Sequence, residues 1–324
     1  AGEQVNKTSE LALLAARAHA GYHATKLEPA LALPYLEKTA SLLQRLRPEA
    51  RLERFSVQSQ ITEALLRQGK PEAAMKRAQS LIQQMDQTPT DGGQELRANV
   101  QMMLARSLRA LHRFDEAVRA AELALENAAS VNPDSRTVLL IRSQLAAIYD
   151  EAGDCEQSLE VMREVSAEAT RLVGLNNRFT LIENGNLGFK EYECGDPAVG
   201  LALVEEVGET LRVANGNDDT ASQAFRVFAA EAYADKGQYD RSLALLDGLE
   251  PAKLVAAQSE PEWAARLEAI RGQALLGKGK YAEAVALLKA AIPQLRKLHG
   301  DPEAIEKYER CLETARGELT LSKR

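Results

Sequence analysis

The chain has 324 residues, 45% of them hydrophobic and 27% charged, so it can bury a hydrophobic core. Its formal net charge of −7 argues against nucleic-acid binding by the chain as a whole, because such proteins usually carry a basic face. No stretch approaches the roughly 18 consecutive apolar residues of a membrane-spanning helix, and the first ten residues lack the pattern of a signal peptide. We expect neither nucleic-acid binding nor membrane insertion, and the missing initial Met suggests a processed chain or a part of a longer protein.

The first 54 residues are predicted to form a degenerate helix pair. Residues 9–27 and 33–46 both have apolar residues at helical spacing. Pro34 is expected to open the second of these helices, since proline is tolerated in a first helical turn.

From residue 55 to residue 298 a short phrase recurs, with variants such as QGKPEAA, KGQYDRS and KGKYAEA. Its anchors are Gly69, His112, Gly153, Gly195, Gly237 and Gly279, at steps of 43, 41, 42, 42 and 42 residues. Such even spacing predicts six repeats of one structural unit.

Each repeat is expected to be two antiparallel helices joined by a turn at the anchor. Glycine suits such a turn because it adopts the left-handed conformation without steric cost, and His112 is expected to replace it in a structural role. Small residues lie at two fixed distances from the anchor, where they let the paired helices approach closely. Five positions after the anchor are Ala74, Ala117, Ser158, Gly200, Ser242 and Ala284; seven before it are Thr62, Ala105, Ala146, Gly188, Ala230 and Gly272.

With paired helices and small residues at these fixed positions, the chain resembles the tetratricopeptide repeat family. LARSLRALHRFDEAVRAAELALE and RGQALLGKGKYAEAVALLKAAI are the clearest copies. The usual period of that family is about 34 residues, and the longer period here resembles the kinesin-light-chain type. The resemblance implies an all-α fold: one right-handed superhelical solenoid of about 6–7 antiparallel helix pairs over residues 1–324, ended by a capping helix over residues 299–324.

The sequence does not favour an enzyme. It contains no phosphate-binding glycine motif and no nucleophile motif. His19 and His23 could share a helix face but have no third ligand nearby, so we expect no metal and no cofactor. Cys155, Cys194 and Cys311 are an odd number at wide spacing, which predicts three free, partly buried cysteines instead of a disulfide framework or a zinc site.

The resemblance also implies a concave face, lined by the first helix of each repeat, that binds a protein or peptide. Lining positions lie about six to ten residues before each anchor. Among them, Asn186 matches an inner Asn that is common in the kinesin-light-chain type, and an amide can satisfy the main chain of an extended peptide. The predicted binding residues are Glu63, Arg106, Gln144, Asn186, Phe189, Glu231 and Gln273.

The leading hypothesis is a non-catalytic protein- or peptide-binding module. The stretch from ENGNLG to the QALL at 273–276 resembles the repeat regions of membrane-anchored bacterial winged-helix transcription regulators and Ser/Thr kinases. That resemblance implies a sensory or docking domain that faces the periplasm. The alternatives are a cytosolic regulator that responds to a peptide, and a scaffold that assembles a multiprotein complex.

Overall fold

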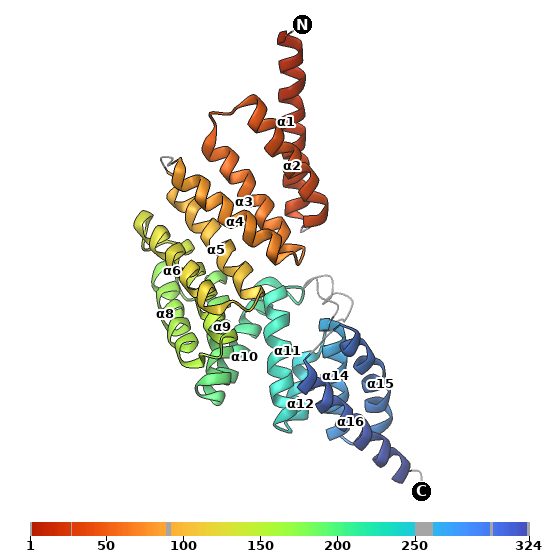
Figure 1. The fold of residues 1–324 in the computed structure, drawn as a ribbon. Coiled ribbons are helices and arrows are strands. Elements are labelled where there is room, and N and C mark those ends of the chain that lie inside the picture. The colour runs from red at the N-terminus through yellow and green to blue at the C-terminus, as the bar shows by residue number, and fades with distance from the viewer. Residues whose placement is uncertain (1, 27, 89–91, 250–261, 299–300, 323–324) are drawn as a thin grey trace. The chain divides into compact units, whose positions relative to one another are not determined.

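The computed structural model describes residues 2–26, 28–88, 92–249, 262–298 and 301–322, with fifteen helices and no strand among them (Figure 1). The predicted all-α repeat fold is confirmed. None of these helices combines the length and the apolar character that a membrane span requires. The chain divides into two compact units, Ala1–Leu172 and Val173–Arg324.

The first unit contains helices α1 to α8. Neighbours in sequence pack against each other from α1 to α7, and α3 also contacts α5, which contacts α7. The first helices of successive repeats therefore lie side by side. The helices are α1 (Gly2–Thr25), α2 (Pro29–Leu46), α3 (Arg51–Arg67), α4 (Pro71–Gln87), α5 (Gln94–Ala110), α6 (Phe114–Val131), α7 (Arg136–Glu151) and α8 (Cys155–Val173).

The second unit repeats this arrangement. Its first helices again touch, since α11 contacts α14 and α14 contacts α16. Helix α12 has only 8 residues, whereas its counterpart α10 has 19. The helices are α9 (Arg178–Cys194), α10 (Pro197–Asn215), α11 (Thr220–Asp235), α12 (Tyr239–Leu246), α14 (Glu262–Gly277), α15 (Tyr281–Lys297) and α16 (Pro302–Leu321). Helix α16 is the predicted final helix, and the Asp301 carboxylate accepts a hydrogen bond from the Glu303 N–H at its start.

Small residues hold the two helices of each repeat close together. All six residues five positions after an anchor are buried, and so are all six residues seven positions before one. At Gly200 the approach is so tight that an added Cβ would lie 2.3 Å from the main-chain N of Tyr192. The small side chains are therefore a condition for packing, as the sequence pattern predicts.

Five of the six anchor turns share one backbone geometry. Gly69, Gly153, Gly237 and Gly279 have φ between 68° and 84°, and His112 has φ 56°. In each of these turns, the N–H of the residue after the anchor donates to the carbonyl of the residue four positions before the anchor, at 2.8 to 3.1 Å. This bond satisfies a carbonyl that the end of the helix would otherwise leave open.

The turn at Gly195 differs, and the expectation of a left-handed glycine there is wrong. Gly195 has φ −117°, and the Asp196 N–H lies 3.4 Å from Oε2 of the Glu191 side chain. Glu191 occupies the position that is Leu or Tyr in the other repeats. Its carboxylate takes the donor that a main-chain carbonyl takes elsewhere, which accounts for an acid at this position.

His112 is the only non-glycine residue with positive φ among the described residues. A side chain in this conformation costs about 1–2 kcal/mol, and the flexibility of glycine in the unfolded chain costs about 0.5–1 kcal/mol. We therefore expect His112→Gly to raise the free energy of unfolding by about 0.5–1 kcal/mol, measured by thermal and urea melts. Gly69→Ala, the opposite change at an equivalent turn, should lower it by a similar amount. A destabilised His112→Gly variant would contradict a purely structural role.

The second helix begins earlier than predicted. Pro29, not Pro34, lies in the first turn of α2, and Pro34 is inside the helix. The helix continues through Pro34, which has no N–H to donate to the carbonyl of Ala30. Ala30 is exposed, so water can donate to that carbonyl instead.

The cysteine prediction is also wrong in part. Cys155 and Cys194 are disulfide-bonded, and Cys311 is a half-buried free thiol. Linear spacing did not reveal this, because the distance between two cysteines along the chain does not fix their separation in the fold.

Candidate ligand-binding face of the first helices

The predicted binding residues occupy one register of the first helices. Six residues before an anchor lie Glu63 on α3, Arg106 on α5, Phe189 on α9, Glu231 on α11 and Gln273 on α14; nine before an anchor lie Gln144 on α7 and Asn186 on α9. We call the side of the helices that carries these residues the first-helix face. It is described separately for each unit.

In the first unit, the register brings two charged residues together. The Arg106 guanidinium donates to Glu63 at 2.9 Å, and Arg67 donates to the other carboxylate oxygen at 2.7 Å. Both partners keep contact with water, at 22% exposure for the Glu63 side chain and 34% for Arg106. Such exposed pairs contribute about 0–1 kcal/mol to stability, so these groups can exchange partners at low cost. Gln144 is half-buried on α7.

A cavity of about 300 Å³ lies beside Glu63 in the first unit. Its lining combines apolar residues with polar side chains, among them Ser59, Gln60, Glu63 and Arg67. Such a combination is typical of ligand sites. The remaining lining residues are Ala24, Glu28, Pro29, Ala32, Leu36, Ala64 and Met103.

The two histidines of α1 have packing roles near this cavity. The rings of His19 and His23 both stack on Tyr35, with centroids 4.8 Å and 5.7 Å away. His23 Nδ1 lies 2.7 Å from Glu28 Oε2. Their contacts therefore account for their spacing without a metal ion.

In the second unit, the first-helix face contains an aromatic cluster. The ring of Phe189 lies 4.5 Å from Phe228 and 5.2 Å from Phe225, and Tyr192 meets Phe228 edge-on at 5.3 Å. Asn186 lies three residues before Phe189 on α9 and is half-buried. Partly exposed aromatic rings beside an amide can take up an apolar side chain and bond a main chain.

Glu231 and Gln273 belong to a polar network that joins α11, α14 and α16. Glu231 accepts hydrogen bonds from Arg266 at 2.6 Å, Lys307 at 2.9 Å and Tyr308 at 2.7 Å. Asp235 extends the network, because it accepts from Gln273 at 2.7 Å and from Lys307 at 3.2 Å. Two acids balance two bases, so the network is neutral overall.

The network changes the protonation of Glu231, which is only 9% exposed. Burial opposes its ionisation, but the charges of Arg266 and Lys307 and the hydrogen bonds from Tyr308 and Lys307 outweigh burial. Together they lower the pKa of Glu231 to about 2. Burial and the negative charge of Glu231 raise the pKa of the Tyr308 hydroxyl. Glu231 is therefore ionised and fully engaged inside the protein.

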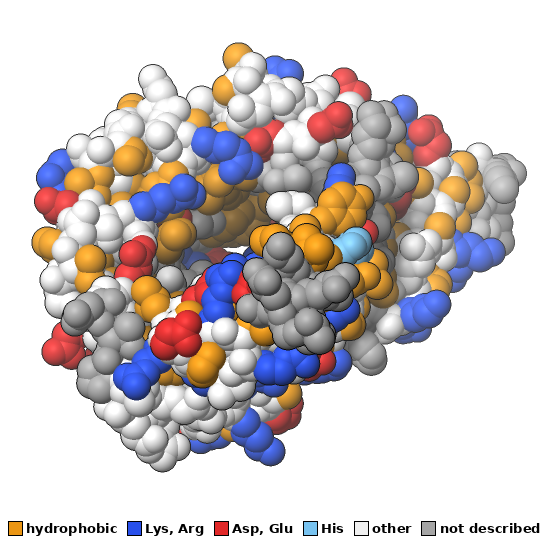
Figure 2. Space-filling view, turned by 90° about the horizontal axis from the view of Figure 1, so that it is seen from above, with side chains coloured by type: hydrophobic (Ala, Val, Ile, Leu, Met, Phe, Trp, Pro, Cys, Tyr) orange, Lys and Arg blue, Asp and Glu red, His pale blue; other side chains and the backbone are white. Residues whose placement is uncertain are grey.

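Figure 2 shows one face of the molecule, on which acidic and basic side chains are interspersed with apolar ones. No extended area of one charge is visible there. This face offers mixed contacts of the kind that protein surfaces use with each other.

Residues 96–167, which cover α5 to α7 and most of α8, match the tetratricopeptide repeat family. The match identifies this segment as tetratricopeptide repeats. No curated protein sequence matches the chain. The family match explains the small-residue register, and the 42-residue spacing adds about two helical turns to the usual repeat.

Solved structures share the fold of this chain at low sequence identity. Aspartyl phosphate phosphatase F of Bacillus subtilis has a TM-score of 0.67 and 12% identity, over 94% of this chain and 74% of its own. The Rap conjugation gene regulator of plasmid pLS20, solved in complex with the Phr* peptide, has a TM-score of 0.56 and 16% identity. The match covers 91% of this chain and 74% of the regulator. TPR-like repeats of a putative kinesin light chain of Podosopora anserina have a TM-score of 0.51 and 20% identity. The match covers 65% of this chain and 97% of that one.

Sequence reasoning missed the partners of Glu231. Arg266 lies outside the positions six to ten residues before an anchor, and Lys307 and Tyr308 lie on the capping helix. A usable signal was present, because Glu231 interrupts the apolar stretch VFAAEAYA, where an acid needs buried partners. Glu63 and Arg106, which the sequence places at equivalent positions of two repeats, lie within hydrogen-bond distance of each other.

Proposed function

We propose that this tetratricopeptide repeat protein is a non-catalytic module that binds a protein or peptide on its first-helix face. The observation that carries the proposal is that residues of this face meet across neighbouring first helices. Glu63 and Arg106 meet in the first unit, and Phe189 and Phe228 meet in the second. The face thus offers charged groups in the first unit, aromatic rings in the second and amides in both, which are groups that can contact a peptide.

Within this face the residues have different roles. Arg106, Gln144, Asn186 and Phe189 are proposed to contact the ligand, because their side chains are partly exposed. Glu231 and Gln273 are proposed to act indirectly, since the network around Glu231 fixes the neighbouring helices. The likeness to a Rap regulator solved with a bound peptide supports a peptide as one form of the ligand.

For the biological setting, we propose the sensory or docking domain of a bacterial signalling protein. A membrane-anchored winged-helix regulator or Ser/Thr kinase with these repeats in the periplasm is supported by the sequence resemblance alone. A cytosolic regulator that responds to a peptide is the second candidate, supported by the likeness to the Rap regulator. A full-length gene with a kinase or winged-helix domain before a transmembrane segment would favour the first.

The binding proposal is tested with peptides selected from a displayed library on the intact chain. Arg106→Ala and Asn186→Ala should each weaken binding about 5- to 10-fold by fluorescence anisotropy, as expected for the loss of one or two hydrogen bonds. Thermal stability should change little, because the Arg106 pair is partly exposed.

Matched controls are Arg119→Ala on α6 and Asn99→Ala on α5, both at exposed positions outside the register. These should bind like wild type. If the Arg106 and Asn186 variants also bind like wild type, the first-helix face is not the binding surface.

A further inference from the structure

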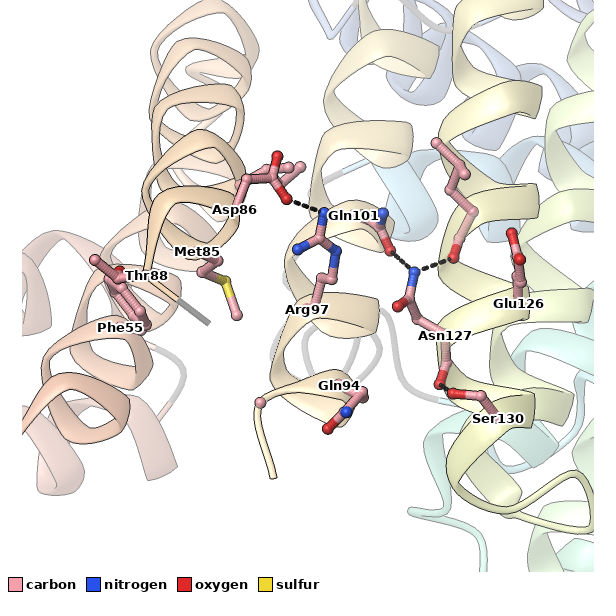
Figure 3. Close-up of a pocket in the computed structure, with 13 residues that line it drawn as sticks. Phe55, Met85, Asp86, Thr88, Gln94, Arg97, Gln101, Glu126, Asn127 and Ser130 are labelled. Carbon is pink, nitrogen blue, oxygen red and sulfur yellow. Dashed lines mark hydrogen bonds and ion pairs between the residues drawn. The ribbon is translucent and has the colours of Figure 1, made fainter. Parts of the chain in front are cut away.

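A second and larger cavity lies in the first unit, away from the register of the first-helix face. Its volume is about 650 Å³, within the range of small-ligand sites. It opens between α4 and α6, and α5 forms its floor (Figure 3). The lining residues are Phe55, Ile82, Met85, Asp86, Thr88, Gly93, Gln94, Arg97, Gln101, Leu123, Glu126, Asn127 and Ser130.

The floor contains a buried pair of amides. Gln101 is only 4% exposed, and its Oε1 accepts a hydrogen bond from Asn127 Nδ2 at 3.0 Å. The same Asn127 nitrogen also donates to the Leu123 carbonyl at 2.8 Å. In Figure 3 the two side chains point toward each other across the gap between α5 and α6.

This pairing leaves one donor and one acceptor open. Both N–H groups of Asn127 are used, but its Oδ1 has no partner among the residues that the structure describes, and neither has Gln101 Nε2. A donor and an acceptor side by side are complementary to an amide group, which offers one of each. Gln101 and Asn127 both line the cavity, so the open donor and acceptor are available to a ligand that enters it.

The rest of the lining selects among amide ligands. Phe55, Ile82 and Met85 form an apolar wall opposite the amides, and Leu123 lies at the rim with 49% of its surface exposed. The charged lining residues are two acids, Asp86 and Glu126, and one base, Arg97. Asp86 pairs with Arg97 across the cavity. The surplus of acid disfavours an anion, and the apolar wall favours an aliphatic group next to the amide.

We propose that this cavity binds a short, uncharged segment of an extended peptide. One peptide group of the ligand donates to Asn127 Oδ1 and accepts from Gln101 Nε2. The adjacent aliphatic side chain packs on Phe55, Ile82 and Met85. None of the predicted binding residues of the first-helix face lines this cavity, so the two sites can be tested independently.

The test uses the intact chain with methyl-¹³C-labelled methionine and the probe N-acetyl-Ala-Leu-Ala-amide. The Met85 methyl signal should shift in a saturable way, whereas that of Met162 on α8, outside the lining, should not. Gln101→Leu removes the amide at similar volume, and Ser130→Trp obstructs the exposed rim without touching the amides. Both variants should bind about tenfold more weakly or worse, with unchanged circular dichroism.

Two further ligands sharpen the result. An analogue with the leucine peptide group replaced by an ester loses the donor and should bind about tenfold more weakly. The free-acid peptide should bind more weakly than the amide, because its carboxylate meets a lining with more acids than bases. The proposal is overturned if Met85 does not respond to the amide probe, if Gln101→Leu binds like wild type, or if the ester or the free acid binds as well as the amide.

Discussion

Gly200→Ala is expected to cost about 3 kcal/mol or more of unfolding free energy and to disrupt the packing of α9 against α10. The new Cβ would lie 2.3 Å from the N of Tyr192 and 2.6 Å from the carbonyl O of Gly188. Both atoms belong to the backbone of α9, so no side-chain rotation relieves the overlap and the helices must separate. Urea unfolding followed by circular dichroism measures the loss.

Two other glycines separate this clash from the general effect of Gly→Ala. Gly21 in α1 and Gly317 in α16 have nothing within 4 Å of an added Cβ. Alanine there should raise stability by about 0.5–1 kcal/mol, because it favours the helix. If Gly200→Ala behaves like these two variants, the close approach of α9 and α10 is wrong.

Glu231→Gln is expected to cost about 3 kcal/mol at pH 7. The change leaves Arg266 and Lys307 beside each other without the carboxylate that both of them contact. Removal of one partner from a buried ionic group is costly for this reason. Asp235→Asn is the matched control, since the Asp235 side chain is 40% exposed, and it should cost less than about 1 kcal/mol.

The cost of Glu231→Gln should depend on pH. The folded protein lowers the pKa of Glu231 from 4.5 to about 2, so the wild type gains up to about 3 kcal/mol at pH values above 4.5. That gain is lost as the pH falls from about 4.5 toward 2, because the folded state then also binds the proton. The difference between wild type and variant should shrink over this range. A difference that stays constant from pH 7 to pH 2.5 would show that Glu231 is not held as an ion.

The repeat architecture was predictable because each helix pair depends on a local pattern. The anchors and the small residues around them recur about every 42 residues, and the structure has them in place. The geometry of the turn at Gly195 was not predicted. It depends on which group accepts from the Asp196 N–H, the Glu191 carboxylate or a main-chain carbonyl. The shortness of α12 also escaped prediction, because the repeat spacing continues across it.

The candidate sites were predictable only where they follow the register. The pairing of Glu63 with Arg106 joins equivalent positions of adjacent repeats, so the period alone implies it. The amide pair of Gln101 and Asn127 combines a first helix with a second helix at unrelated positions of the period. Its cavity draws on four helices, and no local pattern in the sequence marks it.

The network around Glu231 bears on how the end of the chain folds. In a solenoid each repeat usually contacts only its neighbours, so terminal repeats can fray one at a time. Here Lys307 and Tyr308 reach back 76 and 77 residues to Glu231, past the whole α14–α15 repeat. Release of α16 would therefore leave a buried carboxylate short of partners two repeats away. The coupling extends to second neighbours, so α11, α14 and α16 are expected to unfold together as one cooperative block.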